Sequence, residues 1–152
     1  MLSVTMETVS GGRRLRVARL GKGPPLVLLH GYPENLQIWC ELTPLLAERF
    51  EVIAFDWPGM GESDPWPGAV APEHMAARVV ALLDHWGIER ASLVGHDMGG
   101  QPALACAARH PDRVERGLQH QRASSCRRSA ARTPEMAQKL THWPGCVALP
   151  AT

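Results

Sequence analysis

Hydrophobic residues in the first 116 positions alternate between short unbroken runs and longer stretches with helical spacing. Short runs of apolar and small residues are typical of strands that are buried on both faces of a parallel sheet. Such runs stand at 26–29, 52–55 and 91–94. Two loosely alternating segments precede them, separated by paired glycines that can supply the positive φ of a tight turn. We therefore expect a hairpin within residues 2–20, followed by three buried strands.

Apolar residues with helical spacing predict helices between and after these strands. The spacing covers residues 36–50, 72–87 and 103–110. Pro44 lies inside the first of these helices and predicts a kink or a restart there, and we expect Gly87 to end the second. Because strands and helices alternate, the sequence predicts an α/β fold with a mostly parallel sheet and flanking helices.

The strongest chemical signal is Gly95-His96-Asp97-Met98-Gly99, which stands between a predicted strand and a predicted helix. A nucleophile elbow needs glycines on both sides because its turn is tight and neighbouring chains press close. The turn places the central side chain at a helix N-terminus, which favours negative charge. Asp97 is already ionised at neutral pH and needs no base for a first attack. The alternative is that Asp97 only caps the helix.

Two further motifs follow the first two buried strands: residues 30–33 read H-G-Y-P, and residues 56–64 read D-W-P-G-M-G-E-S-D. With the elbow, they make the chain resemble the α/β-hydrolase fold family, specifically its Asp-nucleophile branch of epoxide hydrolases and haloalkane and haloacetate dehalogenases. That branch shows H-G-x-P, D-x-x-G-x-G-x-S-D and G-H-D-x-G-G in this order. The resemblance covers residues 2–116 and implies the N-terminal part of that fold.

The resemblance also implies roles for individual residues. Asp97 would attack an electrophilic carbon and form an alkyl ester, which water then hydrolyses. The backbone N–H groups of Tyr32 and Met98 would form the oxyanion hole, and such donors contribute about 3–4 kcal/mol each. Pro33 is expected to be cis. The remaining motif residues are expected to shape the elbow and its neighbouring loop: His30, Gly31, Pro33, Gly95, His96, Gly99 and Gly100.

Other noticeable side chains are expected to be structural. Asp56, Ser63 and Asp64 are expected to hold the glycine-rich loop through bonds from side chain to backbone. Trp39 and Trp57 are expected to pack in the core, with pocket lining as the alternative.

Two positions indicate which enzyme of the Asp-nucleophile branch the chain resembles most. Haloalkane dehalogenases usually hold the halide with Asn at the x of H-G-x-P and with Trp after the nucleophile, where this chain has Tyr32 and Met98. Fluoroacetate dehalogenases place Arg after the nucleophile and again three residues further on, where this chain has Met98 and Gln101. A small uncharged organic substrate and an epoxide hydrolase-like activity are therefore favoured. Dehalogenase-like and esterase-like activities stay open as alternatives.

Composition and charge limit the cofactors and partners that we expect. The four cysteines have no C-x-x-C spacing, so we expect no metal, redox pair or cofactor. The net charge of +1 favours no nucleic acid, and no apolar run approaches the ~18 residues of a membrane span. The first residues show no basic stretch before an apolar core, so a cytoplasmic location is the expectation.

The last 36 residues differ from the rest. Residues 1–116 carry 11 basic and 14 acidic side chains, whereas residues 117–152 carry five basic and one acidic. The second part is rich in Arg, Ser and Pro without hydrophobic period, so we expect no buried strand and a disordered or weakly structured tail. We interpret the change near Arg116 as a lost reading frame.

The family resemblance requires a later acid, a later histidine and a cap domain, and none has a matching position here. The histidines His110, His120 and His142 have no family motif around them and receive no role. We therefore expect an incomplete fold that is inactive or alkylated only once. The non-catalytic alternative is a truncated product or binding module that self-associates through the open edge of the sheet.

Overall fold

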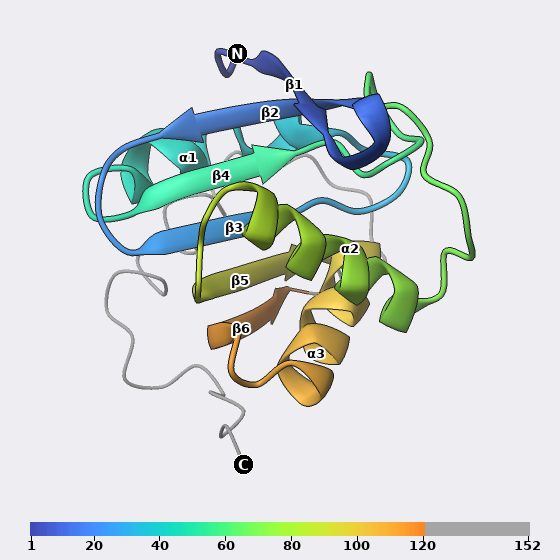
Figure 1. Ribbon diagram of the computed structural model, residues 1–152. Coiled ribbons are helices and arrows are strands. Elements are labelled where there is room, and N and C mark those ends of the chain that lie inside the picture. Colours follow the sequence, from blue (N-terminus) through green and yellow to red (C-terminus); the bar gives the residue numbers. More distant parts are fainter. Residues whose placement is uncertain (121–152) are drawn as a thin grey trace, which may run out of the picture.

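A computed structural model describes residues 1–120, which form one mixed sheet of six strands in the order β1-β2-β4-β3-β5-β6 (Figure 1). β1 pairs antiparallel with β2, and β2 pairs antiparallel with β4. All remaining pairs are parallel, as the unbroken apolar runs predicted. The strands are β1 (Thr5–Val9), β2 (Arg13–Leu20), β3 (Pro25–Leu29), β4 (Glu51–Phe55), β5 (Ala91–His96) and β6 (Val114–His120).

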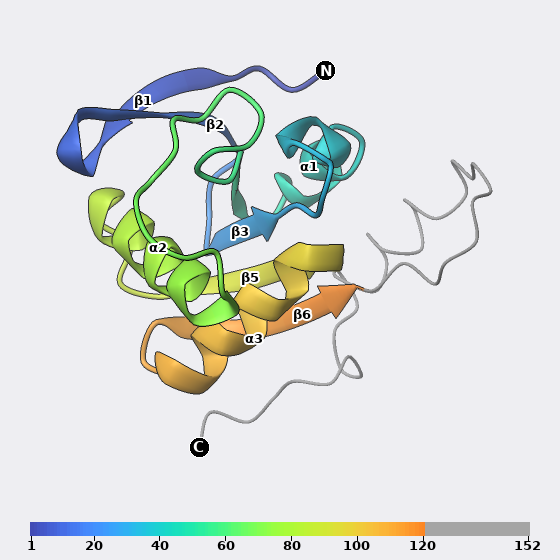
Figure 2. The ribbon, with the colours of Figure 1, turned by 90° about the vertical axis from the view of Figure 1, so that its right-hand side faces the viewer.

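Helices cover both faces of this sheet (Figure 2). The helix α1 (Leu42–Leu46) packs on one face, and α2 (Pro72–His85) and α3 (Gly100–Arg109) pack on the other. Short 3-10 turns complete the elements: η1 (Ser10–Gly12), η2 (Leu36–Trp39) and η3 (Asp97–Gly99). The predicted hairpin and α/β class are thus confirmed. None of the helices within residues 1–120 is long and apolar enough to cross a membrane.

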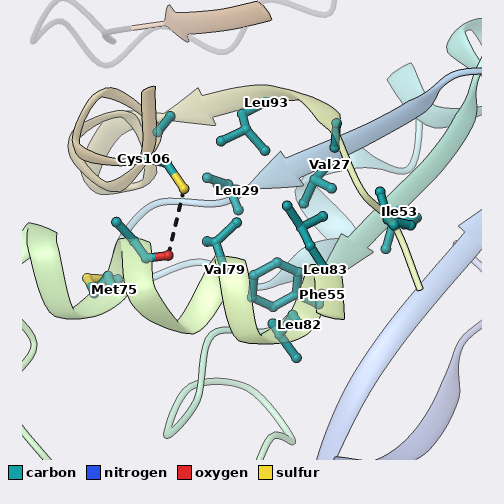
Figure 3. Close-up of a cluster of buried hydrophobic side chains, with 14 of the residues drawn as sticks. Val27, Leu29, Ile53, Phe55, Met75, Val79, Leu82, Leu83, Leu93 and Cys106 are labelled. Carbon is teal, nitrogen blue, oxygen red and sulfur yellow. Dashed lines mark hydrogen bonds between the residues drawn. The ribbon is translucent and has the colours of Figure 1, made fainter. Parts of the chain in front are cut away.

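The unbroken apolar run of β3 fills two cores because successive side chains point to opposite faces of a strand. Leu26 and Leu28 join the cluster beneath α1, whereas Val27 and Leu29 join the larger cluster beneath α2 and α3. Figure 3 shows the larger cluster, in which the Cys106 Sγ donates to a backbone carbonyl of α2. Burial raises the pKa of the Cys106 thiol to about 11, so it behaves as a neutral core residue.

The stretch with helical spacing at residues 36–50 forms two short elements, η2 and α1, so the predicted restart is confirmed. The Asn35 side chain accepts from the Gln37 N–H at 2.9 Å and begins η2, which ends at Trp39. Pro44 lies in the first turn of α1, where its missing N–H costs no intrahelical bond. Leu36 and Trp39 of η2 and Leu42 and Leu46 of α1 still pack on the same face of the sheet.

The end of the described sheet corrects a second expectation. We expected no buried strand beyond residue 116 and assigned residues 117–120 to the tail, yet β6 continues to His120 and pairs in parallel with β5. The expectation failed because strand pairing uses main-chain hydrogen bonds and needs no apolar run at an edge. Among residues 114–117, the part of the strand whose burial is described, Val114 alone is buried. The rest of the predicted tail, residues 121–152, lies outside the described residues, and self-association along this edge stays a prediction.

Candidate active site

Three loops meet at one edge of the sheet because β3, β4 and β5 are parallel and adjacent. The carboxyl ends of parallel strands share an edge, where α/β proteins commonly bind ligands. The loop after β3 carries His30 to Pro33, the loop after β4 begins at Asp56, and the turn after β5 begins at Asp97. The structure therefore brings the sequence motifs together.

The elbow after β5 has the tight geometry that its glycines require. Asp97 has φ +50°, and it is the one residue other than glycine with positive φ within residues 1–120. A side chain on Gly95 would collide with the backbone of Gly99 and Gly100. A side chain on Gly99 would collide with the backbone carbonyls at the end of β3. The glycines thus let the turn approach both its own helix and the neighbouring strand.

The Asp97 carboxylate is exposed and held by backbone donors. The Tyr32 N–H donates to Oδ2 at 3.2 Å. Hydrogen bonds from the N–H groups of Met98 and Tyr32 hold the pKa of this carboxyl below its ordinary value, with a further contribution from His96. The two N–H groups expected to form an oxyanion hole therefore both face Asp97.

The capping alternative for Asp97 does not hold. Asp97 is the first residue of η3, and the N-cap position of α3 is Gly99, which has no side-chain hydrogen bond. The carboxylate accepts from the Met98 N–H of η3 and, across the sheet edge, from the Tyr32 N–H of the loop after β3. In that loop the Tyr32–Pro33 peptide is cis, as expected.

His30 is fully buried and links the loops after β3 and β4. Its Nε2 lies 3.1 Å from the Trp57 N, and its Nδ1 lies 2.8 Å from the Gly31 carbonyl oxygen. The Trp57 indole N–H in return donates to the His30 carbonyl at 2.9 Å. Burial lowers the pKa of this imidazole, although the Gly31 carbonyl and the Asp56 and Glu34 carboxylates act in the opposite direction. The expected loop-orienting role is consistent with this geometry.

His96 of the elbow forms a polar pair with Glu34, a residue that the sequence motifs did not single out. The Nε2 of His96 lies 3.6 Å from Oε1 of Glu34, and the His96 ring meets Trp39 edge-on at 6.2 Å. The Gly31 N–H donates to the other oxygen of Glu34 at 3.2 Å. Glu34 directly follows H-G-Y-P, and this position was the one feature of the sequence that could have indicated a place at the site.

Asp56 organises the glycine-rich loop, as expected. Its Oδ1 accepts from the Leu36 N–H at 2.7 Å, and its Oδ2 accepts from the Glu62 N–H at 3.1 Å. Arg16 Nη1 lies 3.4 Å from the same Oδ2. The Ser63 hydroxyl donates to the Asp56 carbonyl at 2.8 Å and accepts from the Arg16 N–H at 3.0 Å.

The structure bears on the expectations for Asp64 and for the two tryptophans. Asp64 bonds outside its own loop, because Oδ2 accepts from the Arg14 N–H at 2.8 Å and Oδ1 lies 3.2 Å from the Arg14 guanidinium. Trp39 and Trp57 are both buried in the core clusters, as predicted. Within residues 1–120, no group of three or more His, Cys, Asp or Glu side chains is arranged to hold a metal ion.

Comparisons with known proteins agree with this arrangement. A family model described as the alpha/beta hydrolase fold matches residues 24–117. The chain is 38% identical over 110 residues to a soluble epoxide hydrolase from Corynebacterium sp. (strain C12), which covers 72% of this chain and 38% of that protein. It is 43% identical over 101 residues to a fluoroacetate dehalogenase from Burkholderia sp., which covers 62% of this chain and 33% of that protein.

A solved structure shows the same kind of fold. The ligand-free epoxide hydrolase CorEH superposes with a TM-score of 0.73 at 29% identity, over 92% of this chain and 55% of that chain. The chain spans about a third of the length of the curated relatives it matches.

Proposed function

Since the chain belongs to the α/β-hydrolase fold family, we propose that its elbow carries a hydrolase site in which Asp97 opens an epoxide. The observation that carries the proposal is the Asp97 carboxylate itself. It is exposed on a positive-φ turn, it has a lowered pKa, and the Tyr32 N–H binds one of its oxygens at 3.2 Å. A carboxylate in this setting is ionised at neutral pH and is presented to a substrate.

The first step is an attack by Oδ1, the oxygen that Tyr32 does not hold, on an epoxide carbon. The new C–O bond forms as the ring C–O bond breaks, and the released ring oxygen takes a proton from water. The product is an ester of Asp97 whose carbonyl oxygen is Oδ2. That oxygen stays beside the Tyr32 N–H.

The second step is the attack of water on the ester carbonyl. Negative charge then develops on Oδ2, where the Tyr32 N–H is already in place. Fixed donors at such a position stabilise the transition state by about 3 kcal/mol each. The geometry around Asp97 therefore favours ester chemistry, whichever electrophile formed the ester.

The side chains around Asp97 favour an uncharged substrate. Tyr32 is 68% exposed beside the carboxylate, and Met98 follows it in the chain. Within residues 1–120, no Lys or Arg forms an ion pair with Asp97. A substrate with its own carboxylate would be repelled by Asp97 without a cation to offset the repulsion.

Dehalogenation is the second candidate, favoured by the 43% identity to a fluoroacetate dehalogenase. The same carboxylate would displace a halide and form the same kind of ester. Met98 and Gln101 stand where that resemblance predicts arginines for the substrate carboxylate, so we rank this activity below epoxide opening.

We further propose that this chain is alkylated once and does not turn over rapidly. Two of the described histidines near the elbow are engaged elsewhere: His30 contacts Gly31 and Trp57, and His96 contacts Glu34 and Trp39. A general base must lie within hydrogen-bond reach of the water that it activates. Neither ring is free for that role.

Incubation of the full chain with styrene oxide, an uncharged epoxide, followed by intact mass measurement tests these proposals. We expect one adduct with the mass of the whole epoxide, located on Asp97 by fragmentation and absent in Asp97→Asn. Asp64→Asn, which changes another solvent-accessible aspartate of the same edge, is the matched control and should still be alkylated. An unmodified chain would support the non-catalytic alternative, and many turnovers per chain would contradict single alkylation.

A further inference from the structure

We propose that His30 is a positioning residue for the oxyanion hole: its ring holds the peptide between Gly31 and Tyr32 so that the Tyr32 N–H points at Asp97. The inference deepens the proposed function and rests on it for its catalytic consequence. Its geometric part concerns one peptide group and can be tested separately.

The argument begins with the planarity of the peptide bond. The Gly31 carbonyl and the Tyr32 N–H belong to the same peptide unit, and in a trans peptide they point in opposite directions. His30 Nδ1 lies 2.8 Å from the carbonyl oxygen, and the N–H on the other side donates to Asp97 Oδ2 at 3.2 Å. One end of the rigid unit is therefore held by the imidazole, and the other end presents the donor to the carboxylate.

The partners of His30 also define its protonation. The Gly31 carbonyl can only accept a hydrogen bond, so Nδ1 must carry the proton. The Trp57 N–H can only donate, so Nε2 must be the bare nitrogen. The ring is thus the neutral Nδ1–H tautomer, which the Trp57 N–H in the loop after β4 selects. The lowered pKa of this buried imidazole is consistent with that state.

Tight packing prevents other groups from taking over this role. His30 is 0% exposed, and a side chain on Gly31 would lie 2.7 Å from the Asp97 carboxylate. Gly99 in turn packs against the backbone carbonyls of Leu29 and His30. Water cannot readily replace the ring, and the loop has no space to rotate as a unit without striking the elbow.

A hydrogen bond to the carbonyl also strengthens the N–H of the same peptide as a donor. Hydrogen bonds in series polarise one another, and the effect is larger in a buried site. The series runs from Trp57 N–H through the His30 ring and the Gly31–Tyr32 peptide to Asp97. Loss of the ring should therefore weaken the donor that stabilises charge on Oδ2.

Two substitutions separate the ring's hydrogen bonds from its volume. In His30→Asn the amide nitrogen can occupy the place of Nδ1 and donate to Gly31, whereas His30→Leu has similar volume and no donor. His74, an exposed residue of α2, supplies the control His74→Leu. The ester on Asp97 is formed first with styrene oxide, and its cleavage by hydroxylamine is then followed by mass. This reaction converts the ester into a hydroxamate, releases the alcohol and requires no general base from the protein.

We expect hydroxylamine cleavage to be roughly tenfold slower in His30→Leu, because misorienting a donor costs less than the 10²–10³ observed when one is removed. His30→Asn should stay within about threefold of the unsubstituted chain, since it keeps the donor to Gly31. His74→Leu should not differ. Equal cleavage rates in all four proteins would overturn the inference.

Two measurements do not depend on ester formation. Nitrogen-15 shifts of the His30 ring in the unsubstituted chain should report the neutral Nδ1–H tautomer, and an Nε2–H tautomer or an imidazolium at pH 7 would overturn the inference. Carbon-13 titration of Asp97 should show a higher pKa in His30→Leu than in His30→Asn. If no ester forms on the unsubstituted chain, the proposed function fails while these two results still decide the role of His30.

Discussion

Asp56 and Asp97 stand at equivalent places in the fold and have opposite environments. Each follows a parallel strand that flanks β3, and each accepts a backbone N–H from the segment after β3. Asp56 is fully buried, with two backbone donors and Arg16 around it. Asp97 is exposed, has positive φ and has no cation paired with it within residues 1–120.

The difference shows how one residue type gives structure at one strand end and chemistry at the next. A buried carboxylate whose oxygens are both hydrogen-bonded can only hold a loop, because its removal leaves several buried donors without an acceptor. An exposed carboxylate on a strained turn contributes little to folding and can react. Strain at such a position persists when the surrounding structure enforces it, as the Gly95 and Gly99 contacts do here.

The same substitution at both positions should give the largest contrast. Asp56→Asn places an amide N–H₂ against either the Leu36 or the Glu62 N–H and leaves Arg16 with the exposed Glu62 as its remaining ion-pair partner. We expect a loss of about 3 kcal/mol or more in the free energy of unfolding. Asp97→Asn should change it by less than about 1 kcal/mol, because the site is exposed. Urea unfolding followed by circular dichroism measures both, and equal losses would remove the distinction.

Gly31→Ala should have the next largest effect and should act at Asp97 and Glu34, not at Asp56. The added Cβ would lie 2.7 Å from Asp97 Cβ and Oδ2, so the loop or the carboxylate must shift. Overpacking of this kind costs about 1–3 kcal/mol, and alkylation of Asp97 should slow as well. Gly117→Ala is the control, since a Cβ there meets nothing within 4 Å. If both variants unfold at the same urea concentration, the contact between the loops is not tight.

Asp97→Gly should stabilise the fold while it removes the nucleophile. A left-handed residue with a side chain is strained, and glycine relieves that strain. We expect a gain of about 0.5–1 kcal/mol in the free energy of unfolding, reduced by the greater freedom of glycine in the unfolded chain. A lower thermal midpoint in calorimetry would mean that the carboxylate stabilises the turn more than its backbone strains it.

The smallest expected effect is that of pH on alkylation. The backbone donors lower the pKa of Asp97, so the carboxylate is already fully ionised at every pH above the ordinary titration range of aspartate. The alkylation rate should vary by less than about twofold between pH 5.5 and 8 and should fall only in more acidic solution. A rate that rises with a midpoint near neutrality would instead indicate activation by a histidine.

Much of the fold could be predicted because buried parallel strands are unbroken apolar runs. The runs at 26–29 and 52–55 lie within β3 and β4, and the run at 91–94 lies within β5. The elbow was also predictable, since the required glycines are adjacent in the chain. β6 was missed because its pairing depends on the main chain of β5, and the division of residues 36–50 was underestimated because packing on the sheet set their ends.

The sequence by itself determined which residues can do chemistry here: a carboxylate between two glycines after a buried strand, with an H-G-x-P segment elsewhere in the chain. Only the tertiary structure decided how these groups act on one another. Tyr32 and Asp97 are 65 positions apart, and His30 and Trp57 are 27 apart, yet each pair is joined by a hydrogen bond. Local pattern reports burial and turn geometry. The Met98 N–H that lowers the pKa of Asp97 is local, but the Tyr32 N–H that adds to this lowering and the Trp57 N–H that selects the His30 tautomer come from distant segments and arrive only when the sheet assembles.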